Sequence, residues 1–427
     1  MTREVRDVRE NAKKAVPGSR LIGVMRVLWL GMGLIGMLRG STDFWDLPPI
    51  RYADGVATDR MAALAVAVEE GRMKWPEEGG LETLKMVLAW LEVPEESQVL
   101  VFSKTSKQIG RIRPDQPRAL YFSLDSYVGY VPGGAVEVVT QDPVLGPVFY
   151  LVERNGAAVE VVRDRSDCLS CHGTTRTEGV PGVLVRSVFP DQSGHSIGRH
   201  GSIDVRGSTP LTERWGGYYV TGRSSFPHLG NRVFEEDEKP EAALEPMLKL
   251  AETVDLSRYL RATSDIVALM VLEHQCEVHN ALTEASFRYQ RARFLAQAID
   301  PAADPDAGQA GRIAEHHAAK VVDLLLFKNE ADVGEDLVGD EAFQDAYQGM
   351  IPSTEQGSLA DFRLYRRIFK HGCSPMIYSK AFRTLPPRVK AAVIKALAAA
   401  LAERGDDRAA KRLRAILAAS VDGWPRE

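Results

Sequence analysis

The pentapeptide Cys168-Leu169-Ser170-Cys171-His172 constrains this chain more than any other feature. Its two thiols lie three residues apart, so each can add to one vinyl group of a haem. The imidazole that follows can then reach the iron from the proximal side. The spacing therefore predicts one covalently attached haem c, held by Cys168 and Cys171, with His172 as the proximal ligand.

The C-x-x-C spacing also occurs in zinc sites and in redox dithiols. A zinc site would need a second Cys/His pair, but the other cysteines, Cys276 and Cys373, are isolated from each other and from any C-x-x-C partner. A thioredoxin-like dithiol usually opens a helix, and the Gly173-Thr174-Thr175-Arg176 segment forms helices poorly. A redox or chance C-x-x-C stays as the alternative.

An apolar run near the N-terminus, Val27 to Leu38, lies between Arg26 and Arg39. As a helix it would span about 18 Å, which is short of the roughly 30 Å hydrocarbon core of a bilayer. Residues 1–40 are therefore predicted to be a signal peptide, or a short membrane anchor if no cleavage occurs, with a buried core helix as the alternative. The predicted location is periplasmic or otherwise exported, which agrees with the assembly of c-type haem outside the cytoplasm.

Charge is distributed unevenly along the chain. Residues 1–39 carry eight Lys or Arg and three acidic residues, a net +5, so the total of −5 leaves −10 for the remainder. Nucleic acid is not an expected partner, because phosphate binding needs a basic face on the folded body. Membrane contact is expected only through the N-terminal segment, if it is retained.

The length of 427 residues exceeds what one hydrophobic core usually serves, so two folded parts are expected. The acidic, proline-terminated segment at 235–246 is the predicted linker between them. Residues 41–234 are predicted to form a haem c-binding α+β domain, an antiparallel sheet flanked by helices. Residues 247–427 are predicted to form a mainly helical domain, and the whole fold class is α+β.

Hydrophobic periodicity gives the expected elements. Helices are predicted at 60–69, 81–91, 256–299, 312–327, 341–350, 358–369 and 387–419, the last interrupted near Gly405. Strands are predicted at 99–102, 119–122, 127–131, 135–139, 148–152, 158–162 and 183–189. Asn155-Gly156 is predicted to form a type I′ hairpin turn, and Gly216-Gly217 to mark a bulge or the close approach of another backbone or a haem edge.

A distal iron ligand could come from several places. His228 follows an aromatic strand-like segment in the haem domain and is the first candidate, and His195 and His200 lie in a loop near the motif. Met270 and His274 are weaker candidates, which share one face of a predicted helix. Hydrogen-bonded or solvated histidines and a core methionine are the alternative interpretations. Arginines near the motif are candidate partners for haem propionates: Arg163, Arg165, Arg176 and Arg186.

Asp167 to Gly173 resembles the haem-attachment segment of monohaem c-type cytochromes, and the span from Tyr52 to Leu385 resembles large exported cytochrome c domain proteins of environmental bacteria. The resemblance implies thioether attachment at Cys168 and Cys171 and proximal ligation by His172. It implies a location and a cofactor, but no substrate.

Three functions are open at this point. The first is electron transfer between redox protein partners, with a membrane-associated complex as one candidate partner. The second is a haem enzyme or a redox or gas sensor with an open or displaceable sixth site. The third is a structural subunit of a larger redox complex. A helical region of this size favours docking or assembly over free diffusion. Of the three functions, electron transfer is favoured over catalysis. No nucleotide-binding or serine-hydrolase motif is present.

Overall fold

The computed structural model describes residues 43–425 except 157, 245–248, 303 and 406. The described residues from Trp45 onward form one compact unit, which contains the described sheet and helices and the C-x-x-C-H motif. The predicted leader over 1–40 lies outside the described residues. None of the helices in the described part of the chain combines the length and the hydrophobicity needed to cross a bilayer.

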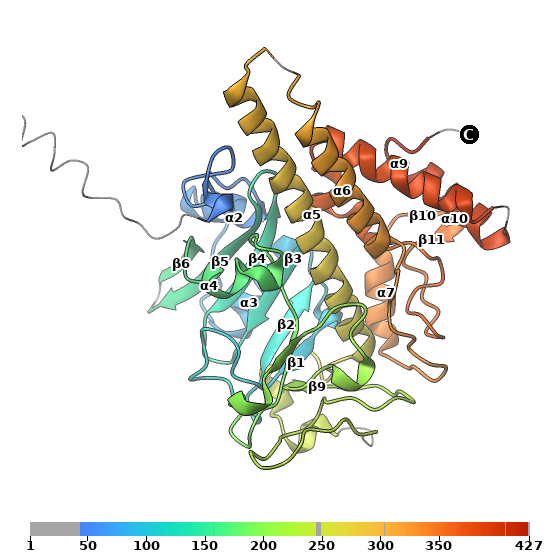
Figure 1. Ribbon diagram of the computed structural model, residues 1–427. Coiled ribbons are helices and arrows are strands. Elements are labelled where there is room, and N and C mark those ends of the chain that lie inside the picture. The colour runs from blue at the N-terminus through green and yellow to red at the C-terminus, as the bar shows by residue number, and fades with distance from the viewer. Residues whose placement is uncertain (1–42, 157, 245–248, 303, 406, 426–427) are drawn as a thin grey trace, which may run out of the picture. The chain divides into compact units, whose positions relative to one another are not determined.

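The structure confirms the α+β class. An antiparallel sheet of seven strands has the order β6-β5-β4-β3-β2-β1-β9 within the described residues (Figure 1). Its strands are β1 (Val99–Val101), β2 (Arg118–Phe122), β3 (Ser126–Tyr130), β4 (Val136–Asp142), β5 (Gly146–Asn155), β6 (Ala158–Asp164) and β9 (Tyr218–Tyr219). Two-stranded ladders are formed by β7 (Arg186–Val188) with β8 (Ser202–Asp204) and by β10 (Ser353–Thr354) with β11 (Gly357–Ser358).

Side-chain alternation gives the sheet two covered faces. On one face, Tyr150 on β5 donates to the Asp59 carboxylate at 2.6 Å, and Asp59 caps α2 (Arg60–Glu69). Helix α3 (Leu81–Leu91) contacts β3. On the other face, the Tyr127 hydroxyl lies 2.6 Å from Nδ1 of His279, which belongs to α5 (Ile266–Ile299).

The long helix α5 joins the sheet to the C-terminal helices (Figure 1). Asp265 caps its start by accepting from the Ala268 amide at 2.8 Å. The remaining helices are α4 (Leu169–His172), α6 (Gln309–Leu325), α7 (Glu341–Gly349), α8 (Lys380–Arg383), α9 (Pro387–Glu403) and α10 (Arg408–Ser420). Side chains of β1, β2, α5, α6 and α9 share one hydrophobic core. The division into 41–234 and 247–427 stays a prediction.

Three local predictions were wrong. The segment 358–369 is not helical: Leu364 and Arg366 have positive φ angles of 51° and 59°. Its apolar side chains instead join an aromatic cluster in which the Phe362 and Phe369 rings lie 5.2 Å apart. Helix α5 begins ten residues later than the predicted 256, at its Asp265 cap. The β5–β6 turn lies one residue further on, because Asn155 still pairs with Ala158.

The Gly216-Gly217 pair marks a close backbone approach, one of the two predicted alternatives. A Cβ atom at Gly216 would lie 2.2 Å from the Val188 carbonyl oxygen. Gly217, with φ +88°, accepts from the amides of both Phe102 and Ser103, at 2.9 and 3.1 Å. Because one carbonyl accepts from two consecutive amides, the regular pairing of β1 with β9 ends here.

Candidate haem-attachment site

The motif forms a single helical turn directly after β6. The amides of Cys171 and His172 both donate to the Cys168 carbonyl, at 3.2 and 2.9 Å. Residues three and four apart lie on one face of a helix, so Cys168, Cys171 and His172 share a side. Leu169 is buried on another side and anchors the turn.

Asp164, the last residue of β6, holds the start of this turn. Its Oδ1 accepts from the amides of Ser166 and Cys168, both at 3.0 Å, while Lys107 binds its Oδ2 at 2.8 Å. Burial, reinforced by the Asp164 carboxylate, raises the pKa of the Cys168 thiol to about 12. Cys168 is therefore held as a thiol, and Cys171 is exposed.

The His172 imidazole has one nitrogen in use and one without a partner. Its Nδ1 lies 2.9 Å from the Gly182 carbonyl oxygen, which can only accept, so Nδ1 carries the proton. Nε2 then has a lone pair and makes no hydrogen bond in the described part of the chain. Burial lowers the pKa of His172, which favours the neutral ring. This is the tautomer that a metal ligand requires, with its second nitrogen oriented by a backbone carbonyl.

The segment after the motif is fixed to α5. Asn280 accepts from the Val183 amide at 3.0 Å and donates to the Val183 carbonyl at 2.7 Å. The contact is tight, because a Cβ atom at Gly182 would lie 2.3 Å from the Asn280 Oδ1. The carbonyl that orients His172 is therefore placed by the long helix.

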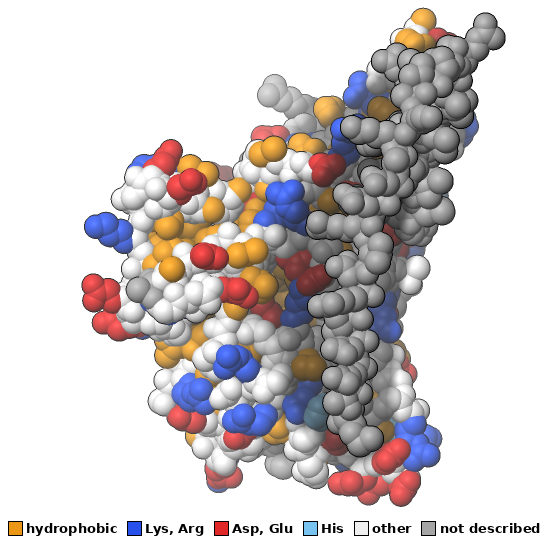
Figure 2. All heavy atoms as spheres, turned by 90° about the vertical axis from the view of Figure 1, so that its left-hand side faces the viewer, with side chains coloured by type: hydrophobic (Ala, Val, Ile, Leu, Met, Phe, Trp, Pro, Cys, Tyr) orange, Lys and Arg blue, Asp and Glu red, His pale blue; other side chains and the backbone are white. Residues whose placement is uncertain are grey.

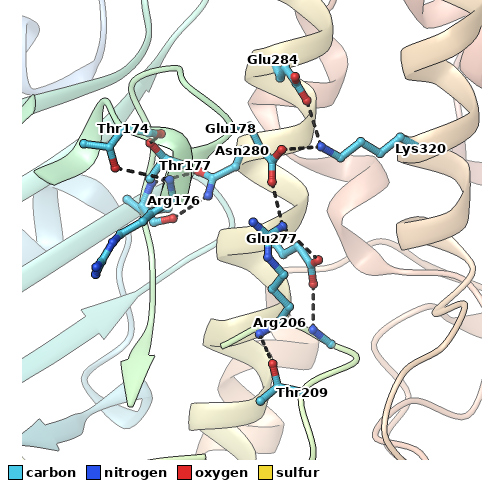
Figure 3. Close-up of polar contacts among 12 residues, drawn as sticks. Thr174, Arg176, Thr177, Glu178, Arg206, Thr209, Glu277, Asn280, Glu284 and Lys320 are labelled. Atoms are coloured by element: carbon cyan, nitrogen blue, oxygen red, sulfur yellow. Dashed lines mark hydrogen bonds and ion pairs between the residues drawn. The ribbon is translucent and has the colours of Figure 1, made fainter. Parts of the chain in front are cut away.

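Ion pairs join the same segment to α5 and α6 (Figure 3). Glu178 accepts from Arg206 at 2.7 Å and from Lys320 on α6 at 2.8 Å. Lys320 also binds Glu284 at 2.9 Å, and Arg206 lies 3.7 Å from Glu277, both of them on α5. Asp164 of β6 thus holds the start of the motif, and the segment after the motif is bound to α5 and α6.

The surroundings fit a flat apolar cofactor attached at the motif. The His172 ring lies 5.2 Å from that of Phe149 on β5. The same face carries Leu151 and, directly opposite it on β6, Val162, which is 43% exposed. Figure 2 views the side on which β6 lies and shows hydrophobic side chains exposed there between charged ones. A macrocycle resting on such a surface would remove apolar area from water.

One arginine near the motif is available for a propionate. The Nε of Arg186 is buried without a hydrogen-bond partner among the described residues, and its charge acts on His172. The other three candidates bind protein groups: Arg163 and Arg165 donate to backbone carbonyls, and Arg176 pairs with Asp204 at 3.5 Å. Arg163 also has a buried Nε without a partner, but both of its terminal nitrogens donate to backbone carbonyls. Arg186 is therefore the candidate whose guanidinium is best suited to a haem propionate.

The structure does not bring His228 to His172. The His228 segment hydrogen-bonds to β9 through Asn231, whereas His172 packs on β5, five strand positions or about 24 Å away. Its Nδ1 accepts from the Gly230 amide at 3.1 Å, so the neutral ring carries its proton on Nε2. His228 is therefore arranged as a structural histidine against Trp215.

Met270 and His274 are also held elsewhere. Met270 is buried in the core ten residues before Asn280, about 15 Å along α5. His274 lies 2.7 Å from the Ser374 hydroxyl through Nε2, and its ring packs on Phe327. Burial lowers its pKa to about 3, so the ring is neutral.

The buried His228 gives a pH dependence of stability. Burial lowers its pKa from 6.5 to about 4, so the unfolded chain binds a proton that the folded chain rejects. The free energy of unfolding should therefore fall as pH drops from about 6.5 to about 4, by at most about 3 kcal/mol from this residue. In urea unfolding across this range, His228→Asn should show a flatter profile than the wild type. Parallel profiles would contradict the assignment.

Sequence reasoning singled out the motif but missed Gly182 and Asn280, which orient its imidazole.

The remaining cysteines, Cys276 and Cys373, are both buried and free. Among the described residues, no group of three or more His, Cys, Asp or Glu is placed to hold a metal ion. Comparison with protein-family models, with curated proteins and with solved structures finds no match.

Proposed function

We propose that the protein is an exported monohaem c-type cytochrome that carries electrons between redox protein partners. Haem c would be attached through Cys168 and Cys171 and ligated by His172. The observation that carries the proposal is the His172 ring, whose Nδ1 is bound to the Gly182 carbonyl while Nε2 has no partner. A periplasmic location, free or anchored through the N-terminal segment, follows from the chemistry of haem c assembly.

Within this proposal each residue has a defined part. A bound haem supplies one-electron exchange at its iron. His172 donates the Nε2 lone pair, and the carbonyl of Gly182 increases the basicity of that nitrogen through Nδ1–H. Asp164 positions the Cys168 end of the turn, and Arg186 offers a charge to a propionate. The contacts of Asn280 on α5 with Val183 would hold the adjacent Gly182 carbonyl, and with it the ligand ring, in place.

Intact-protein mass spectrometry tests the attachment. The full chain should gain the mass of one haem when it is produced with the cytochrome c maturation machinery, and nothing without it. The double variant Cys168→Ser/Cys171→Ser should lose the added mass. The double variant Cys276→Ser/Cys373→Ser, which alters the two buried cysteines outside the motif, should keep it. An unmodified wild-type mass after maturation would refute the proposal.

A haem sensor or enzyme with an exchangeable sixth site is the second candidate. It is favoured by the positions of His228, Met270 and His274, which are held away from His172. Carbon monoxide added to the ferrous protein separates the two. An unchanged low-spin spectrum supports a six-coordinate electron carrier, whereas rapid formation of a carbonyl spectrum supports the second candidate.

A further inference from the structure

A cavity of about 410 Å³ lies between α5, α6 and the segment 327–330. Residues 207 and 208 also belong to its lining. Its volume is in the range of small-molecule sites and far exceeds that of a single ion. The cavity is separate from the motif turn, and no step of the proposed electron transfer uses it.

The two lysines of the lining already have carboxylate partners. Lys320 is bound by Glu178 at 2.8 Å and by Glu284 at 2.9 Å (Figure 3). Lys328 pairs with Asp323 at 3.1 Å. The charges of these lysines are therefore already balanced, and they do not need an anionic ligand.

Glu330 is in the opposite situation. Its carboxylate makes no hydrogen bond or ion pair in the described part of the chain, although the side chain is partly buried. Burial raises its pKa to about 7, and the carboxylates of Glu273 and Glu277 act in the same direction against Arg214. The uncompensated charge of the cavity is thus a carboxylate, one that a cation would stabilise.

Apolar side chains line another part of the cavity. Leu324 at the end of α6 and Phe327 just after it belong to the lining. A ligand that satisfied Glu330 and filled this part would therefore carry a positive head and a short hydrocarbon body.

We propose that this cavity binds a small organic ammonium ion, whose head pairs with Glu330 and whose hydrocarbon lies against Leu324 and Phe327. An ammonium group has three donors, and the cavity offers it the Glu330 carboxylate, with Ser208 as a further polar residue of the lining. A bare metal ion fits less well, because the described residues contain no His, Cys, Asp and Glu group of metal-binding geometry.

Titration calorimetry of the full chain tests this with propylammonium chloride and its neutral counterpart 1-propanol, at about pH 8. Propylammonium should bind saturably and 1-propanol should not. Glu330→Gln should weaken binding about tenfold or more, the effect of losing one charge-assisted hydrogen bond. The matched control is Glu335→Gln, which alters a 57% exposed carboxylate of the following segment paired with Arg366.

Lowering the pH gives a test on the wild-type chain. At about pH 5.5 Glu330 is protonated, so propylammonium binding should weaken about tenfold, while the ligand itself stays charged. Of the groups lining the cavity, Lys320 remains charged at both pH values, because its bonds to Glu178 and Glu284 outweigh burial and raise its pKa. His274, with a pKa lowered to about 3, remains neutral. The neighbouring carboxylates have basic partners: Glu273 is paired with Arg214, Glu277 with Arg206 and Asp323 with Lys328. His316 also lines the cavity, so the weakening is assigned to Glu330 only if Glu330→Gln abolishes it.

Three results would overturn the proposal. One is equal binding of propylammonium and 1-propanol, and another is binding that neither Glu330→Gln nor the lower pH weakens. The third is Mg²⁺ or Ca²⁺ displacing propylammonium at a lower concentration than propylammonium itself needs. None of these readouts depends on haem, so failure here leaves the cytochrome proposal untouched.

Discussion

Replacing Arg214 with methionine should lower the free energy of unfolding by about 3–5 kcal/mol, the usual cost of breaking a buried ion pair from one side. Arg214 lies 2.8 Å from Glu273, and the two side chains are only 5% and 1% exposed. Trp215 donates to the other Glu273 oxygen at 2.7 Å, so the carboxylate would stay buried with one partner. Urea unfolding followed by tryptophan fluorescence measures the loss.

Two controls show whether the loss of stability comes from the Glu273 carboxylate, which Arg214→Met leaves buried without its charged partner. Adding Glu273→Gln to Arg214→Met should recover part of the loss, because a neutral amide costs less to bury. Arg199→Met removes an exposed pair with Asp237, in which the side chains are 53% and 99% exposed, and should cost less than about 1 kcal/mol.

The loss of unfolding free energy caused by Arg214→Met should also depend on pH. Burial already raises the pKa of Glu273, and loss of Arg214 would raise it further. The cost of Arg214→Met should therefore be largest at neutral pH and shrink as the carboxylate is protonated at acid pH. A cost that does not change with pH, or one no larger than that of Arg199→Met, would show that Glu273 is not a stranded charge.

Much of the sheet was predictable because its contacts are local. Strands β1 to β6 follow one another as hairpins, so alternation and turn residues were enough to find them. The arrangement of Cys168, Cys171 and His172 was predictable for the same reason, because it depends on a single helical turn. The pairing of β9 with β1 was not predicted, because the two are more than 100 residues apart in the chain.

The failures come from tertiary packing. The 358–369 segment has a helix-like spacing of apolar residues, but its phenylalanines are placed by an aromatic cluster rather than by a helix face. The distal candidates were chosen by residue type and by nearness in sequence, and the fold separates them from His172. Gly182 lies outside every predicted element and motif, and Asn280 is one of several polar residues on α5. Over residues 273–280, polar and apolar residues of α5 are mixed, and the structure buries both kinds. Buried polar side chains need hydrogen-bond partners, so this mixture was the sequence feature that could have pointed to Asn280.

Asn280→Ala should therefore affect the motif from a position that no motif search would find. The substitution leaves the buried amide and carbonyl of Val183 without partners, at a cost of about 2–4 kcal/mol in unfolding free energy. It also releases the adjacent Gly182, whose carbonyl binds His172 Nδ1 at 2.9 Å. Urea unfolding measures the first effect, and the visible absorption spectrum of the haem-loaded protein measures the second.

The chain contains a matched control for this pair of bonds. Asn231 accepts from the Val220 amide at 2.7 Å and donates to the Val220 carbonyl at 2.9 Å, at the β9 edge of the sheet. Asn231 has φ +66°, so glycine replaces it without backbone strain. Asn231→Gly should destabilise the fold to a similar extent and leave the haem bands in place, whereas Asn280→Ala should shift them. If both variants leave the bands unchanged at equal cost in stability, then the docking of Gly182 on α5 does not orient the imidazole.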